Sequence, residues 1–397
     1  MIPEAQKTDV TVLHASPAAA GGPPHVEVPV AYDGLLLAGF GGPEGQDDVI
    51  PFLRNVTRGR GIPDERLEEV AHHYRHFGGI SPINAQNRAL KAALEAELAR
   101  RAIDLPVYWG NRNWAPYLEE AVTDAATSGH TKLLALATSA YSSFSSCRQY
   151  REDFARVLEA TDLGGTVTID KVRQFFDHPG FVQPFIDGVR DAVAEFLDDG
   201  ITAEAIRVLF STHSIPMADA ERSGPRDRDF GDGGAYAAQH LAVAEVVMTA
   251  VTGEIPAAAQ IGWELVYQSR SGPPTQPWLE PDVNDVIADL PAAGVQAVAI
   301  VPLGFMSDHM EVLWDLDTEA TDVAAEAGLR SVRTPTPGID PTIVAGLVDL
   351  VEERLKGTPA AERPHATDLG PWFDVCRPAC CENIRAGFKP AVSGIAP

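Results

Sequence analysis

The sequence predicts an α/β protein with two Rossmann-like lobes, each a four-stranded parallel sheet flanked by helices. The chain has 397 residues, which is more than one hydrophobic core usually serves. Apolar, β-rich runs alternate with helical patterns, as in parallel sheets that are covered by helices on both faces. Eight such runs divide into two groups of four around residues 175–200.

The apolar runs and the patterns between them define the expected elements. Strands are expected at 33–40, 105–110, 132–138 and 166–174, and then at 205–212, 258–267, 294–303 and 328–334. Helical patterns fill the gaps, for example at 84–102, 180–198, 236–252 and 341–356. We expect the last helix to cross back and pack on the first lobe. The predicted domains are an N-terminal extension (1–30), a first lobe (31–178 plus 337–357), a second lobe (179–336) and a Cys-containing tail (358–397).

Composition excludes several classes of partner. The chain has 56 acidic and 31 basic residues, for a net charge of −25, and nucleic acid requires a basic face. No apolar stretch approaches the roughly 20 residues of a membrane span. Residues 1–30 are rich in Ala, Pro and Gly and lack a basic start followed by an apolar core. We therefore interpret them as a disordered extension rather than a secretory signal, and we expect a cytoplasmic location.

An acidic row follows the strand expected at 294–303. A helix is expected to start near Ser307, which would place Glu311, Asp315 and Glu319 at i, i+4 and i+8 on one face. Three carboxylates in a column repel one another unless cations lie among them. A solvated acidic face remains the alternative. The position favours a ligand site, because open α/β sheets bind ligands at the carboxyl ends of their strands.

A second strand end carries a histidine. His213 directly follows the apolar run 205–212. An isolated histidine is often structural, yet a neutral imidazole binds divalent metals and takes up a proton near neutral pH. His213 and Glu311 both lie at carboxyl ends of strands, so they could face one cleft. Together they could bind a divalent metal ion, accept protons, or do both.

Several segments resemble one enzyme family. FSTHSIP and VPLGFMSDHMEVLWDLD closely resemble the signature segments of ferrochelatases, which insert ferrous iron into a porphyrin. LLLAGFGGPEG (35–45), FGGISPIN (77–84) and WELVYQSRSGPPTQPWLEPDV (263–283) match as well. The resemblance covers about residues 33–356. FLRNVTRGRGIP together with SAYSSFSSCRQYRED is similar to the actinobacterial branch, which is associated with coproporphyrin III rather than protoporphyrin IX.

The resemblance implies a function and a site. It implies the chelatase fold and insertion of ferrous iron, the substrate, into coproporphyrin III to give Fe-coproporphyrin III in haem biosynthesis. His213 and Glu311 would be catalytic and hold iron, and Asp315 and Glu319 would extend an acidic path for iron or protons. Which group binds iron and which takes protons stays open. The alternatives are a protoporphyrin IX ferrochelatase, a chelatase for cobalt or nickel, and a non-enzymatic porphyrin or haem carrier. Transient contact with neighbouring haem-pathway enzymes is a further expectation.

The porphyrin itself needs flat walls and cations for its carboxylates. The Gly-rich turn 39–43 lacks nucleotide-binding spacing and suits close approach of backbone to a flat ligand. Some relatives carry Tyr at the position of Phe40, so Phe40 is not assigned as a metal ligand. The resemblance assigns propionate binding to the segment containing Arg58 and Arg60, together with Ser81, Tyr150 and, as a weaker candidate, Tyr74. An ordinary basic turn is the alternative for the two arginines. Thr57 and His73 depart from the pattern, because some relatives have Arg there.

The four cysteines have a characteristic distribution. Cys147 is internal, while Cys376, Cys380 and Cys381 cluster in the tail. Four thiolates suit a [2Fe–2S] cluster or a structural zinc ion, although the adjacent pair is not a familiar ferredoxin spacing. Some ferrochelatases carry a cluster bound by one internal Cys and three in a C-terminal extension, which is the arrangement of this chain. The resemblance therefore implies a [2Fe–2S] cluster on these four residues; four reduced thiols are the alternative.

Overall fold

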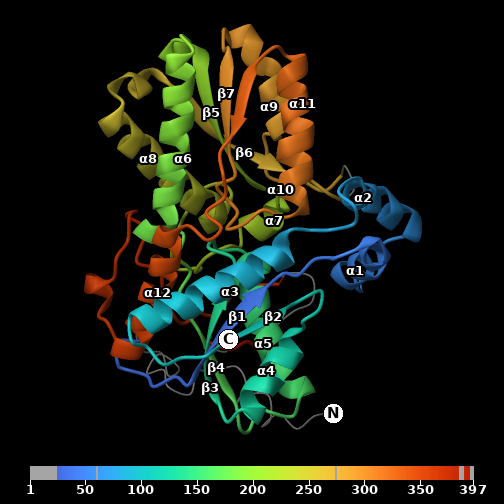
Figure 1. The fold of residues 1–397 in the computed structure, drawn as a ribbon, viewed down its shortest axis with the longest axis vertical. Coiled ribbons are helices and arrows are strands. Elements are labelled where there is room, and N and C mark those ends of the chain that lie inside the picture. Colours follow the sequence, from blue (N-terminus) through green and yellow to red (C-terminus); the bar gives the residue numbers. More distant parts are fainter. Residues whose placement is uncertain (1–24, 60, 273–274, 384–388, 394–397) are drawn as a thin grey trace.

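The computed structural model describes residues 25–59, 61–272, 275–383 and 389–393. It contains two four-stranded sheets, with strand orders β2-β1-β3-β4 and β6-β5-β7-β8. Every strand pair is parallel. Figure 1 shows the second sheet above the first along the long axis, with helices on both sides of each sheet. The predicted two-lobed α/β architecture is confirmed.

The first sheet is centred on a wholly buried strand. It contains β1 (Gly34–Gly39), β2 (Val107–Asn111), β3 (Lys132–Ala137) and β4 (Thr168–Lys171). Alternate side chains of β1 enter different cores, because successive residues of a strand point to opposite faces. Leu35 and Leu37 pack with α3 (Ile83–Arg100) and α12 (Pro341–Lys356). Leu36 packs with α4 (Leu118–Thr127) and α5 (Gln149–Ala160) on the other face.

The second sheet places a long strand at its centre. It contains β5 (Ile206–His213), β6 (Gly262–Gln268), β7 (Ala297–Val301) and β8 (Arg330–Arg333). β5 pairs with β7 only as far as Phe210, which lies opposite Val301, while its pairing with β6 continues to His213 opposite Gln268. The end of β5 therefore projects beyond β7, and His213 lies at its tip.

Helices on two faces enclose this sheet. One face packs with α6 (Pro179–Asp198) and α8 (Gly234–Glu254), and the other with α9 (Val283–Asp289) and α11 (Thr321–Glu326). The core on the α6 side continues into the first lobe, where α12 contacts both α3 and α6. Short elements complete the lobe: α7 (Met217–Ala220), α10 (Met310–Trp314) and a π-helical segment, η8 (Asp315–Ala320).

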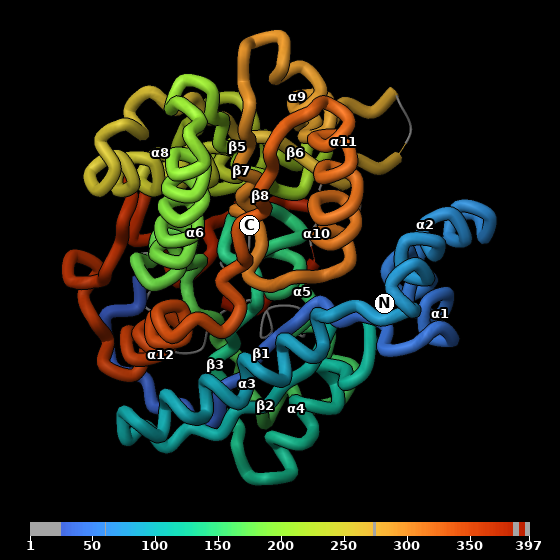
Figure 2. Tube along the Cα trace, turned by 45° about the horizontal axis from the view of Figure 1, so that its top comes forward, coloured from blue at the N-terminus to red at the C-terminus, as the bar shows by residue number. Residues whose placement is uncertain are grey.

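Two helices stand away from the rest of the first lobe. α1 (Val49–Val56) and α2 (Asp64–His76) project to one side in Figure 2. They share a small core of their own. α2 also contacts α10 of the second lobe, so this pair of helices bridges the two lobes near the end of β7.

The predicted N-terminal extension ends differently from expectation. Its residues 1–24 lie outside the described part of the chain. Val26, in its last part, is fully buried against Val375 of the tail, and its amide donates to the Asp374 carboxylate at 2.8 Å. The Arg363 guanidinium binds both the Val26 carbonyl (2.8 Å) and Asp374 (2.7 Å). Residues 25–30 therefore pack on the tail.

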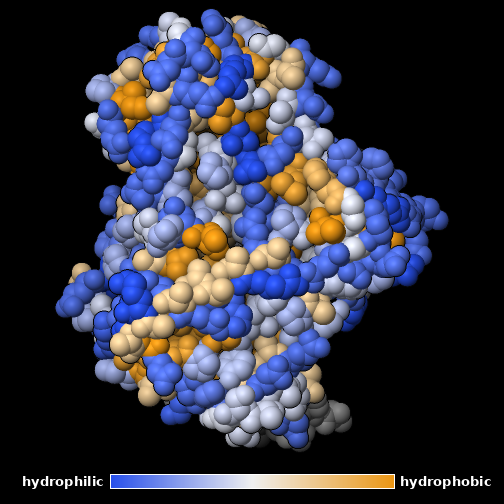
Figure 3. Space-filling model, viewed as in Figure 1, coloured by the Kyte–Doolittle hydropathy of each residue, from blue (hydrophilic) through white to orange (hydrophobic). Residues whose placement is uncertain are grey.

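Polar side chains cover most of the face seen in Figure 3, where hydrophobic ones follow α3 and gather where the lobes meet beside α12. Among the described residues, no helix is both long and apolar enough to cross a bilayer.

Candidate active site

The strand ends and one close backbone approach assemble the candidate site. After β7, the loop to α10 passes directly over the end of β5, where the Gly304 amide donates to the Ser211 carbonyl at 3.1 Å. A β-carbon on Gly304 would lie 2.1 Å from Thr212 Oγ1 and 3.0 Å from Thr212 Cα. Only glycine allows this approach, which carries α10 and Glu311 to the tip of β5.

His213 and Glu311 meet there, as their positions at strand ends predicted. His213 Nε2 lies 3.6 Å from Glu311 Oε2, and the two side chains are 32% and 48% exposed. His213 Nδ1 contacts the Ser214 carbonyl. A carbonyl only accepts hydrogen bonds, so Nδ1 carries the proton and Nε2 faces the carboxylate.

His213 and Glu311 shift each other's pKa values. Burial alone would lower the pKa of His213, but the Glu311 carboxylate and the Ser214 carbonyl raise it to about 9. Burial alone would raise the pKa of Glu311, but His213 lowers it to about 2. At neutral pH the pair is therefore an imidazolium beside a carboxylate. Its imidazole must lose a proton before Nε2 can bind a metal ion.

Side chains of helix α8 form hydrogen bonds with the last residues of β5. The Tyr236 hydroxyl donates to the His213 carbonyl at 2.9 Å. His240 Nδ1 lies 2.7 Å from the Tyr236 carbonyl, and its Nε2 lies 3.0 Å from Thr212 Oγ1. Burial lowers the pKa of His240 to about 3, so this histidine is a neutral structural group. These bonds fix the β5 backbone at the residues that carry the site.

The acidic row differs from the continuous helix that its spacing predicts. α10 begins at Met310 rather than near Ser307, with His309 as N-cap accepting from the Glu311 amide at 3.2 Å. After five residues the helix widens into the π-helical η8. The hydroxyls of Thr318 in η8 and of Thr321 at the start of α11 donate to carbonyls five residues back, at 3.1 and 2.8 Å. The regular α-helical hydrogen-bond pattern is therefore interrupted at Asp315, although, besides burial, the charges of Glu311 and Glu319 both still raise the pKa of Asp315.

The three carboxylates consequently have different partners. Asp315 binds Gln268 Nε2 at 3.2 Å and the Ser269 hydroxyl. Burial, with the Glu311 charge next, raises the pKa of Asp315 to about 7. Glu319 accepts from Trp314 Nε1 at 2.8 Å. Only Glu311 faces His213 directly; Asp315 lies one step away through Gln268, which also donates to the Glu311 carbonyl at 3.0 Å.

Aromatic rings line the side of the first lobe near this pair. The Phe52 ring lies 6.4 Å from Phe40, 5.8 Å from Tyr74 and 6.2 Å from Trp114, centroid to centroid. Burial raises the pKa of Tyr74, and the Glu311 and Asp315 charges raise it further. Tyr74 therefore lies within electrostatic reach of the acidic pair. Such rings are the walls that a flat apolar ligand needs.

The other residues predicted to bind the porphyrin rim differ in their exposure. Ser81 is buried beside the Gly-rich turn, and its amide donates to the Pro43 carbonyl at 2.9 Å. Arg58 is exposed and binds Asn55 Oδ1 at 2.6 Å; Arg60 lies outside the described residues. Tyr150 is 3% exposed, and the Arg112 guanidinium covers its ring at 3.9 Å. Tyr150 thus offers no open surface in this structure.

His73, one of the departures from the family pattern, joins the lobes. Its ring stacks on Trp314 with a centroid distance of 4.1 Å and an interplanar angle of 7°. Because Trp314 directly precedes Asp315, this contact sets α2 beside the acidic row.

The four cysteines are brought together from both ends of the sequence. All four are free and buried. Cys147 and Cys376 hydrogen-bond to each other, Cys376 also bonds Cys380, and Cys380 Sγ lies 3.9 Å from Cys381 Sγ. Bonds from Cys147 and Cys380 lower the pKa of Cys376 well below its ordinary value. In the described part of the chain, no three His, Cys, Asp or Glu side chains already form a metal-binding group. The thiols form a buried row rather than a closed site.

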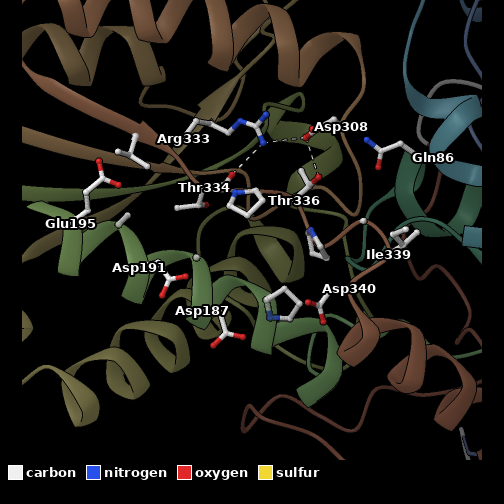
Figure 4. Close-up of a pocket in the computed structure, with 17 residues that line it drawn as sticks. Gln86, Asp187, Asp191, Glu195, Asp308, Arg333, Thr334, Thr336, Ile339 and Asp340 are labelled. Atoms are coloured by element: carbon white, nitrogen blue, oxygen red, sulfur yellow. Dashed lines mark hydrogen bonds and ion pairs between the residues drawn. The ribbon is translucent and has the colours of Figure 1, made fainter. Parts of the chain in front are cut away.

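A cavity of about 540 Å³ lies between α6 and the segment after β8. Figure 4 shows acidic side chains on its walls. Most of them have a basic partner: Asp187 and Asp191 pair with Arg190, Glu195 with Arg330, and Asp308 with Arg333. None of the predicted site residues lines this cavity, so we assign it no ligand.

Comparison with known proteins decides the family. A family model described as Ferrochelatase matches residues 32–355. The chain belongs to the ferrochelatase family. The relative named Coproporphyrin III ferrochelatase from Leifsonia xyli is 68% identical over 97% of this chain and 100% of its own length. Another protein of that name, from Tropheryma whipplei, is 57% identical over 92% of this chain and 93% of its own length.

More distant matches come from a curated protein and a solved structure. A ferrochelatase from Rhodopirellula baltica is 44% identical over 91% of this chain and 96% of its own length. The structure of SirB from Bacillus subtilis with Fe3+ matches with a TM-score of 0.47 and 12% identity, over 84% of this chain and all of that chain.

Several residues around this ferrochelatase-family site escaped the sequence reasoning. Gln268 and Ser269 lie in a segment matched to the family, but neither residue type signals a role by itself. Tyr236 and His240 are four residues apart on α8, which would have indicated one shared face. Phe52 and Trp114 have no signal in the sequence, since only the fold brings them to Phe40.

Proposed function

We propose that this ferrochelatase-family protein inserts ferrous iron into coproporphyrin III, giving Fe-coproporphyrin III in haem biosynthesis. The observation that carries the proposal is the His213–Glu311 pair, 3.6 Å apart, between the tip of β5 and the start of α10. The substrate is suggested by the 68% identical relative named Coproporphyrin III ferrochelatase. A porphyrin carrier would need flat walls but no such pair.

The chemistry requires the removal of two protons. Iron insertion converts two pyrrole N–H groups into metal-bound nitrogens, so two protons leave for each Fe²⁺ that enters. Glu311 is ionised and can accept a proton, while His213 must first pass its own proton on before its Nε2 can bind iron or accept another. Asp315, with a pKa of about 7, is suited to relaying protons at neutral pH. Glu319 marks the outer end of this path.

The macrocycle is proposed to lie against the aromatic rings of the first lobe. Phe40 is 37% exposed and presents an open face beside the Gly-rich turn. Ser81 and Tyr74 would contact the rim, and the exposed Arg58 would bind a propionate through paired N–H donors. Tyr150 remains a proposed rim residue only if Arg112 moves off its ring.

An anaerobic assay tests the proposal directly. Purified protein is given Fe²⁺ with coproporphyrin III, and in parallel with protoporphyrin IX, while the porphyrin and product spectra are followed. We expect catalytic insertion that is faster with coproporphyrin III. Faster turnover of protoporphyrin IX would mean that protoporphyrin IX is the substrate. Tight binding of both porphyrins without insertion would favour a porphyrin carrier.

The four cysteines are proposed to hold a [2Fe–2S] cluster. The donor set fits in chemistry, because four buried thiols lie next to one another in a row and their neighbours lower the pKa of Cys376. When bound, such a cluster supplies one-electron redox chemistry and a cross-link between the tail and the first lobe. A cytoplasmic location and contact with neighbouring pathway enzymes remain predictions from the sequence.

Metal analysis tests the cluster independently of catalysis. Protein purified anaerobically should be reddish-brown, with about two iron and two sulfide per chain. Cys147→Ser should bleach it as fully as Cys376→Ser. Colourless protein with stoichiometric zinc would replace the cluster by a zinc site, and metal-free protein would favour four reduced thiols.

A further inference from the structure

Arg151 lies where two segments of the tail, at residues 374–376 and at Ser393, meet the first lobe. Its side chain is 1% exposed. Nη1 donates to the Ser393 carbonyl at 2.6 Å, and Nη2 donates to the Asp374 carbonyl at 3.1 Å. The same Ser393 carbonyl accepts from the Cys376 amide at 2.9 Å. The Arg151 guanidinium therefore binds the backbone two residues before Cys376, at Asp374, and the carbonyl of Ser393 to which the Cys376 amide donates.

The same residue faces the thiols. Cys147 precedes Arg151 by four residues, in the π-helical segment Phe144–Arg148 that leads into α5. The Arg151 side chain contacts the Cys147 thiol across this junction.

One donor of Arg151 has no oxygen or nitrogen partner. Its Nε–H is buried, and no described nitrogen or oxygen atom accepts from it. The guanidinium lies within hydrogen-bonding reach of the Cys147 sulfur instead. An anionic sulfur-ligated centre at Cys147 would be a stronger acceptor than the thiol.

We propose that Arg151 is a positioning residue of the four-cysteine site, which fastens Cys376 opposite Cys147 and raises the reduction potential of the bound cluster. The inference rests on the proposed [2Fe–2S] cluster. Reduction adds negative charge, so a nearby guanidinium and an N–H···S bond stabilise the reduced state. Arg151 takes no part in iron insertion.

The test compares three variants in the full-length, cluster-loaded protein. Arg151→Met removes the charge and all donors, and Arg151→Lys keeps the charge without the planar fork. Arg156→Met is the matched control, since Arg156 lies on the same helix, 51% exposed, and pairs with Glu119. Reduction potentials are measured by anaerobic titration of the visible absorption. We expect about a tenfold lower ratio of reduced to oxidised cluster in Arg151→Met, which is 59 mV for a one-electron couple. Arg151→Lys should show a smaller shift and Arg156→Met none.

A second measurement covers loss of the cluster. If Arg151→Met is folded but colourless, the potential of Arg151→Lys decides, and a wild-type value there would overturn the inference. Full iron content with a wild-type potential in both Arg151 variants would overturn it too. If the wild type itself lacks a cluster, the cofactor proposal fails separately. In that case, limited proteolysis measures how fast the tail is cleaved in each variant. If the tail of the Arg151 variants is cleaved no faster than that of Arg156→Met, Arg151 does not fasten the tail.

Discussion

At the residue scale, the environment of each histidine decides its role. His213 has one nitrogen on a carbonyl and one on a carboxylate, so its charge is stabilised. His178, the N-cap of α6, accepts from the Gly180 amide at 3.1 Å. Burial, together with the charges of Arg173 and Arg101, lowers the pKa of His178 to about 3. The same residue type is thus positively charged at one position and neutral at the other.

His178 makes stability depend on pH. In the unfolded chain its pKa is about 6.5, while in the folded protein it is about 3. Between these values only the unfolded state binds the proton, so the free energy of unfolding falls as pH falls below 6.5. The expected slope is about 1.4 kcal/mol per pH unit from this group. His178→Asn keeps a capping acceptor and should flatten the profile, whereas His76→Asn, on an exposed residue of α2, should not. Urea unfolding at pH 5 to 7 measures this; equal slopes in all three proteins would contradict it.

At the element scale, the strand ends could be predicted and the π-helix could not. His213 and Glu311 each follow an apolar run, and parallel strands bring such ends to one edge. The row of Glu311, Asp315 and Glu319 has perfect α-helical spacing, but the backbone widens into a π-helix at Asp315, where threonine hydroxyls also donate to carbonyls five residues back. The periodicity of the sequence does not indicate a π-helix at this position. The helix α2 also gave no apolar pattern, since only Leu67 and Ala71 are buried on it.

The altered helix predicts unequal roles in the acidic row. Glu311→Gln should lower the rate of iron insertion by about 10²–10⁴-fold, the range typical of a group that transfers protons. Asp315→Asn should cost less, and Glu319→Gln least, because Glu319 is turned to Trp314. Steady-state rates for the three variants check the order. Equal losses would indicate a general field effect, and no loss would return the row to a solvated face.

The loop after β7 offers a test of assembly. Gly304→Ala would place a methyl group against Thr212 backbone as well as its side chain, so the loop must move away from β5. We expect lower thermal stability and a large loss of iron insertion. The control is Gly253→Ala on α8, where an added methyl meets nothing within 4 Å and should be neutral or slightly stabilising. Wild-type activity in Gly304→Ala would show that the close approach is not needed.

At the scale of the whole molecule, buried charges tie the tail to the first lobe. Arg354 of α12 binds Asp170 of β4 at 3.0 Å and the Tyr32 hydroxyl at 2.7 Å. Its charge also lies 3.8 Å from Asp374 of the tail. Charges buried this deeply need partners. Sequence reasoning treated the tail only as a carrier of cysteines, because long-range ion pairs leave no local pattern.

Removing this central charge should destabilise the protein. Arg354→Met leaves Asp170 and Asp374 buried with less compensation, which costs about 3–5 kcal/mol for buried pairs of this kind. Lys356→Met, on the same helix and 65% exposed, should change the free energy of unfolding by less than about 1 kcal/mol. Urea denaturation of both variants measures the difference. Similar changes in the free energy of unfolding for the two variants would mean that the buried ion pairs of Arg354 do not stabilise the protein more than a surface pair does.

The central claim is that His213, opposite Glu311, performs iron insertion, and one single-turnover measurement tests it most directly. Wild type and His213→Ala are loaded with stoichiometric coproporphyrin III, mixed anaerobically with Fe²⁺, and followed by absorbance. Porphyrin fluorescence quenching in the same samples reports binding. We predict that His213→Ala binds coproporphyrin III like the wild type yet inserts iron at least about 10²-fold more slowly. Insertion at the wild-type rate by the variant would contradict the account.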